Sequence, residues 1–207
     1  MWDGTPFGIS AAMAAFVFAS TAAPGPNAAL MLAVGARVGI GAGATILLGM
    51  ALANAGVKTL AAASIQGMVA LDAVPVELVK WPALVVCAWM AWRILRRGGL
   101  RSGGARAARG LPLARFWTGL AFQCANPKVW VTSFAAAMLF AAPATGSTPH
   151  PAAFGVIALV AVVISAGAFL VLGARHAERL SRPGATRALD LAVAAVLGLA
   201  VLPVLVS

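Results

Sequence analysis

Long apolar stretches dominate the chain, and short polar segments separate them. The segment 4–36 contains no charged residue, and between positions 38 and 71 only Lys58 is charged. A helix needs about 20 apolar residues to cross a bilayer, and these stretches lack the alternation of half-buried strands. We therefore predict an all-α integral membrane protein with about six transmembrane helices. The predicted helices fall within residues 7–36, 38–71, 76–95, 114–142, 152–174 and 188–206.

Composition favours a membrane protein over a soluble one. Of the 207 residues, 62% are hydrophobic and only 10% are charged, whereas a soluble domain has about 25% charged residues. The net charge of +10 would suggest nucleic acid as the partner of a soluble protein. Here the arginines lie between apolar stretches without interleaved aromatic residues, so we expect a lipid bilayer and no nucleic acid. The two cysteines, Cys87 and Cys124, lie in apolar segments, which favours packing over redox or metal-binding roles.

Basic residues occur mainly in alternate connections between the predicted helices. Arg37, the segment 93–115 and the segment 175–187 together hold 12 of the 15 Lys and Arg residues. Cytoplasmic loops of membrane proteins carry an excess of basic residues. We therefore predict that these three connections are cytoplasmic and that both termini lie outside. No basic segment precedes the first apolar stretch, so we expect a retained helix rather than a cleaved signal peptide.

The first and fourth predicted helices are each interrupted by a short segment that contains proline and asparagine. The interruptions are Pro24-Gly25-Pro26-Asn27 and Asn126-Pro127-Lys128. Three predicted helices precede the segment rich in arginine and glycine and three follow it, so the second half enters the membrane from the opposite side. We predict a single polytopic domain, 1–207, made of two inverted three-helix repeats with broken first and fourth helices. The first repeat covers 7–97, the cytoplasmic loop 98–113 and the second repeat 114–206.

The two interruptions predict a binding site. Proline removes a backbone N–H and disturbs the preceding turn, which frees carbonyl and amide groups. Amide groups at the start of a half-helix suit a carboxylate, and freed carbonyls suit an ammonium group. An amino acid carries both groups, and broken helices in matching positions of two repeats mark substrate sites. The alternative is that the prolines only kink helices for packing.

Five polar side chains within the predicted helices are candidates for this site. They are Asn27, Asn54, Lys58, Asn126 and Lys128. A charge such as that of Lys128 is costly within a membrane unless it faces a polar interior, so it is a candidate for the substrate carboxylate or for coupling. A structural role, capping the carbonyls of a broken helix, is the alternative. Asn54 and Lys58 share a helix face, and the Lys58 side chain could instead extend to the outer surface.

Three motifs resemble those of the LysE/RhtB family of amino-acid exporters. Pro24-Gly25-Pro26-Asn27 resembles the PGPN signature of that family. The stretch from Phe116-x-x-Gly119 to Asn126-Pro127-Lys128 resembles its second signature, and the segment 89–96 resembles the end of its third helix. The resemblance implies a multi-pass secondary exporter of the bacterial inner membrane, driven by the proton gradient. Lys58 is an addition to the pattern of that family.

The predicted function is export of small, neutral amino acids or related metabolites. No Asp or Glu lies deep in a predicted helix, so a side-chain ammonium of the substrate would lack a partner. We expect no catalytic residues, no metal and no cofactor, and we leave homo-oligomer formation open. The alternatives are an exporter of heavy metals or other cations, a structural factor of the membrane, and an intramembrane enzyme that uses Lys128 as acid or base.

Small residues recur every fourth position near the start of the second predicted helix. They are Gly35, Gly39 and Gly43. This spacing allows two helices to approach closely in a membrane. We therefore predict that these glycines serve helix packing.

Overall fold

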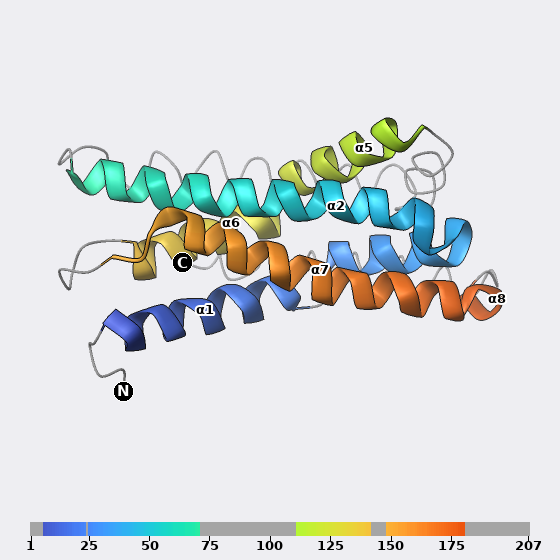
Figure 1. Ribbon diagram of the computed structural model, residues 1–207, viewed down its shortest axis with the longest axis horizontal. Helices are drawn as coiled ribbons and strands as arrows, with labels where there is room; N and C mark the ends of the chain where they lie inside the picture. The colour runs from blue at the N-terminus through green and yellow to red at the C-terminus, as the bar shows by residue number, and fades with distance from the viewer. Residues whose placement is uncertain (1–5, 24, 71–110, 142–147, 181–207) are drawn as a thin grey trace, which may run out of the picture.

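The computed structural model describes residues 6–23, 25–70, 111–141 and 148–180, and its regular secondary structure there is entirely helical (Figure 1). The all-α prediction is confirmed for this part of the chain. The predicted helices at 76–95 and 188–206, most of the loop 98–113, and Pro24 lie outside the described residues. The described helices are α1 (Pro6–Ala22), α2 (Pro26–Ala70), α5 (Pro112–Cys124), α6 (Pro127–Phe140), α7 (Pro151–Arg175) and α8 (Ala177–Leu180).

Proline begins each of the longer described helices. It occupies the first position of α1, α2, α5, α6 and α7. An N–H group at the first position has no acceptor within the helix, so its absence in proline costs no hydrogen bond. The fixed φ angle of proline is also already helical. Because α5 begins at Pro112, the fourth predicted helix starts two residues before its predicted boundary at 114.

The helix α2 consists of two arms that meet at Gly39. This residue has φ 78° and ψ −179°, a conformation open essentially to glycine alone. The first arm (26–38) and the second arm (40–70) run in opposite directions from this point (Figure 1). A Cβ atom added to Gly39 would meet no atom of the described residues within 4 Å, apart from the adjacent backbone. The prediction that Gly39 serves helix packing is therefore wrong, because the residue makes the turn between two helices.

Two pairs of consecutive helices form broken rods. In Figure 1, α1 and the first arm of α2 run one after the other from one end of the bundle to the other, and α5 and α6 do so in the opposite direction. The first rod is interrupted between Ala22 and Pro26, and the second between Cys124 and Pro127. Both interruptions lie near the middle of the bundle, at the two predicted segments.

Glycines bring neighbouring helices into backbone contact. A Cβ atom on Gly119 of α5 would lie 2.0 Å from the carbonyl oxygen of Ile46 on α2. A Cβ atom on Gly173 of α7 would lie 2.1 Å from the carbonyl oxygen of Leu32. Side chains larger than hydrogen would separate these helices, so the second arm of α2 is held directly against α5, and the first arm against α7.

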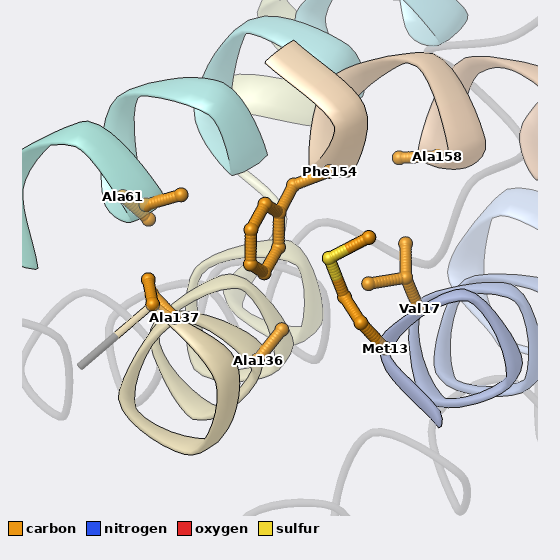
Figure 2. Packing of buried hydrophobic residues seen from close by; sticks show 9 residues of the cluster. Met13, Val17, Ala61, Ala136, Ala137, Phe154 and Ala158 are labelled. Atoms are coloured by element: carbon orange, nitrogen blue, oxygen red, sulfur yellow. The ribbon is translucent and has the colours of Figure 1, made fainter. Parts of the chain in front are cut away.

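The apolar core consists of two clusters at different levels of the bundle. In the first, Phe154 of α7 is fully buried among small side chains and Met13 of α1 (Figure 2). The second lies around the turn of α2 and the end of α7, with Met31, Met50 and Leu170 among its members. The two clusters leave a layer between them along α1, α2 and α6, and this layer holds the polar residues described below.

Two of the described stretches are long and apolar enough to cross a membrane, judged by length and composition: Pro26–Gly67, which includes the turn at Gly39, and Pro151–Arg175. Large apolar side chains also point outward along these helices. Leu48, Leu60 and Ile164 are each more than half exposed. The described part of the chain is therefore apolar on its outer surface as well as in its core.

Candidate functional site

The buried polar side chains of the described residues gather between the two apolar clusters. On the second arm of α2, the buried Asn54 and Lys58 follow Ala51 of one cluster and precede Ala61 of the other. The other buried polar side chains are Thr21 of α1, Gln123 of α5, Asn126 at the second interruption and Ser133 of α6. An otherwise apolar bundle thus contains a polar layer at the level of the helix interruptions.

The two interruptions are in direct contact. The side-chain amide of Asn126 donates a hydrogen bond to Oδ1 of Asn27, with 2.9 Å between the nitrogen and the oxygen. The Oδ1 atom of Asn126 accepts a hydrogen bond of 3.1 Å from the backbone N–H of Lys128. Asn126 therefore caps the start of α6 and also joins α6 to the start of α2.

At each interruption, a side chain donates a hydrogen bond to a carbonyl group at the end of the preceding helix. The ammonium group of Lys128 donates to the carbonyl oxygen of Ala23, directly after α1. The indole N–H of Trp130 donates to the carbonyl oxygen of Cys124, at the end of α5. Lys128 thus has the contact expected of a cation that caps a broken helix, and its ammonium group has further N–H groups with which to bind a ligand.

Lys58 lies in the polar layer and does not extend to the surface. Its side chain is 1% exposed, and its ammonium group donates to Oγ1 of Thr132 at 3.1 Å and to Oγ of Ser133 at 3.4 Å. The Thr132 hydroxyl donates in turn to the carbonyl oxygen of Lys128, at 2.8 Å. The interpretation of Lys58 as a surface-reaching side chain is wrong, because α6 covers it.

Several buried polar atoms in the layer have no hydrogen-bond partner among the described residues. These are Oγ1 of Thr21, Oδ1 of Asn54 and both amide atoms of Gln123. A buried polar atom without a partner costs about 1–3 kcal/mol. The layer therefore has unused capacity to accept and to donate hydrogen bonds.

The structure brings together most of the predicted site residues that it describes. Gly25 lies beside Lys128, since a Cβ atom on Gly25 would lie 3.5 Å from the Lys128 nitrogen. Pro26 and Pro127 begin helices, and Asn54 lies in the polar layer without a described hydrogen bond to the other candidates. The predicted residue Pro24 lies outside the described residues.

Sequence reasoning missed four residues of the layer. Thr132 and Ser133 hold the Lys58 ammonium, and Thr21 and Gln123 have unpartnered polar atoms. Their only signal in the sequence is a polar residue within about two turns of an interruption. That signal is weak, because a lone Thr, Ser or Gln in an apolar helix often bonds its own backbone.

The layer carries positive charge. Lys58 and Lys128 contribute two ammonium groups, and Glu178, exposed on α8, is the only acidic residue of the described part. Cys124, for which a packing role was predicted, has an exposed side chain. The chemistry on offer is thus two cations with neutral amides and hydroxyls.

Comparison with protein-family models, with curated proteins and with solved structures finds no match to this chain. The likeness to the LysE/RhtB family therefore rests on the motif residues.

Proposed function

We propose that this chain is a multi-pass secondary transporter of the bacterial inner membrane, similar to the LysE/RhtB exporters, that moves small amino acids or related carboxylate-bearing metabolites outward. The proton gradient would drive the export. Three observations support this proposal: the apolar outer surface, the opposed broken rods and the polar layer where the interruptions meet.

The distribution of polarity supports an environment of lipid. The described helices expose Leu48, Leu60 and Ile164 and bury Lys58, Asn126 and Gln123. A soluble protein rarely exposes a large continuous apolar surface. In lipid, by contrast, apolar side chains face outward, and polar side chains are tolerated where they face the interior of the bundle.

The opposed directions of the two broken rods support an inverted repeat. One rod consists of α1 and the first arm of α2, and the other of α5 and α6 (Figure 1). Transporters built from inverted repeats place their substrate between discontinuous helices at the repeat interface. The six-helix arrangement and the repeat boundaries belong to this proposal.

The observation that carries the proposal is the contact between the two interruptions. Asn126 bonds Asn27, and Lys128 bonds the carbonyl of Ala23, across 99 and 105 residues of sequence. The ammonium group of Lys128 would bind the substrate carboxylate. The unpartnered oxygens of Asn54 and Gln123 would accept hydrogen bonds from its amino group. Alternating access would require the contacts between the rods to open and close.

Substitution of Lys128 tests the proposal. We expect Lys128→Ala to abolish amino-acid efflux from cells while the protein remains at normal abundance in the membrane. Lys128→Arg should also be strongly impaired, because a planar guanidinium does not replace a compact ammonium group in a shaped site. Efflux would be measured as resistance to an excess of each amino acid or toxic analogue, together with immunoblots of the membrane fraction.

The matched control is Arg175→Ala, which removes a cation from the exposed end of α7 and should leave efflux unchanged. Normal efflux by Lys128→Ala at normal abundance would overturn the proposed site. Loss of abundance in both Lys128 variants would instead show that Lys128 serves only to join the two rods.

A further inference from the structure

Lys58 is an ammonium group without an opposite charge in the described structure. Its hydrogen-bond acceptors, Thr132 and Ser133, are neutral hydroxyls. Each hydroxyl donates its own proton to a backbone carbonyl, that of Lys128 at 2.8 Å and that of Val129 at 2.5 Å. The lone pairs of both hydroxyls are therefore left to accept from Lys58. They hold the ammonium group in place but do not neutralise it.

The second lysine of the polar layer, Lys128, lies on the turn of α6 that holds the Lys58 ammonium group. Thr132, which accepts from Lys58, follows Lys128 by four residues and bonds its carbonyl. The hydroxyl that accepts from Lys58 therefore lies about one helical turn along α6 from the backbone of Lys128, and both lysines add positive charge to the polar layer. Like charges within one layer repel, and they do so more strongly away from water. A bound anion would relieve the repulsion, and it would give the buried Lys58 the opposite charge that it lacks among the described residues.

A zwitterionic substrate does not balance this charge. A neutral amino acid brings one carboxylate and one ammonium group, which leaves the layer with the same excess of two positive charges. A substrate with a further carboxylate removes one of them. The amide oxygen of Asn54, one turn before Lys58 on α2, and that of Gln123 have no partner among the described residues and can accept from the ammonium group of the substrate.

We propose that the transported substrate is a small acidic amino acid or a related organic anion that carries more carboxylates than ammonium groups. Lys58 binds the additional carboxylate, and Lys128 binds the other. This inference rests on the proposed export function. It replaces the expectation of neutral substrates, which was argued from the absence of Asp and Glu deep in the predicted helices.

Glutamate and glutamine provide a matched pair of probes, because they have nearly the same shape and differ by one negative charge. Wild-type protein reconstituted in liposomes should exchange radiolabelled glutamate at least tenfold faster than glutamine at equal low concentration. Lys58→Met, which keeps the length of the side chain and removes its charge, should lower glutamate exchange at least tenfold more than glutamine exchange. Arg175→Met, at the exposed end of α7, should leave the ratio at its wild-type value.

Binding to wild-type protein provides a readout that does not depend on the folding of a variant. Glutamate should raise the thermal midpoint of the protein in detergent at concentrations where glutamine does not. Equal stabilisation by both probes, or an unchanged exchange ratio in Lys58→Met, would overturn the inference. A wild-type protein that exchanges glutamine as fast as glutamate would overturn it while amino-acid transport stands. Exchange of no amino acid would overturn the proposed function as well.

Discussion

The hydrogen bond between Asn126 and Asn27 links the two broken rods directly, and its energy can be isolated by substitution. Asn126→Ala removes two interactions: the bond from its amide to Asn27 and the cap that its oxygen provides to the N–H of Lys128. Asn27→Ala removes only the first of them. Asn126→Ser retains an oxygen suited to the cap and is too short to reach Asn27.

The expected magnitudes follow from these contacts. Loss of an N-cap costs about 1 kcal/mol, and a side-chain hydrogen bond between helices in a membrane is worth about 0.6–1.7 kcal/mol. We expect Asn126→Ala to lower the free energy of unfolding by about 2 kcal/mol, and Asn27→Ala and Asn126→Ser by about 1 kcal/mol each. The double variant with alanine at both positions should lose about 2 kcal/mol rather than 3, which is a coupling energy of about 1 kcal/mol.

The assay is reversible unfolding in mixed micelles of a mild detergent and a denaturing one, followed by tryptophan fluorescence. Leu60→Ala, a substitution of an exposed side chain on α2, serves as the control, and its effect should add to that of Asn126→Ala. Losses from Asn27→Ala and Asn126→Ala that add within about 0.3–0.5 kcal/mol would refute a direct bond between the two residues. A loss from Asn126→Ser equal to that from Asn126→Ala would refute the separate contribution of the cap.

Substitution by alanine should destabilise the protein at Gly119 and at Gly39, for different physical reasons. Gly119→Ala places a methyl group 2.0 Å from the carbonyl oxygen of Ile46, so it should lower the free energy of unfolding by about 1–3 kcal/mol. The control is Gly56→Ala, whose methyl group meets no described atom within 4 Å and which should raise the free energy of unfolding by about 0.5–1 kcal/mol. Equal effects in the two variants would contradict close packing of α2 against α5. At Gly39 an added methyl group also meets no described atom within 4 Å, but φ is 78°, so backbone strain in Gly39→Ala should lower the free energy of unfolding by about 1–3 kcal/mol. Gly41→Ala, equally unobstructed, should not lower it. The same unfolding assay distinguishes the two variants, and a stable Gly39→Ala would show that the turn of α2 tolerates a side chain.

Local features of the sequence were enough to determine the class and most helix boundaries of the described part. The apolar stretches excluded strands, and the longer described helices start at prolines, where the chain loses no hydrogen bond. The interruptions lie where Pro26 and Pro127 required them. These features depend on the backbone chemistry of one residue and its neighbours in the chain, so they can be predicted without knowledge of packing.

The role of a glycine or a lysine could not be predicted in the same way. The spacing of Gly35, Gly39 and Gly43 suggested packing for all three, but only the φ angle of Gly39 identifies it as a turn. Gly35 and Gly43, by contrast, do face Leu170 of α7. Spacing assigns a residue to a face of a helix and leaves open which other helix covers that face.

Only the tertiary structure decided which polar groups share a site. Asn27 and Asn126 lie 99 positions apart, and their hydrogen bond depends on the opposed course of the two rods. Lys58 could have extended to the surface by its position along α2, yet Thr132 and Ser133 of α6 cover it. Sequence reasoning passed over Gln123 because a lone amide in an apolar helix indicates little. The physical reason is common to all these cases: the sequence sets what each side chain can bind, and the packing of distant helices sets what lies within its reach.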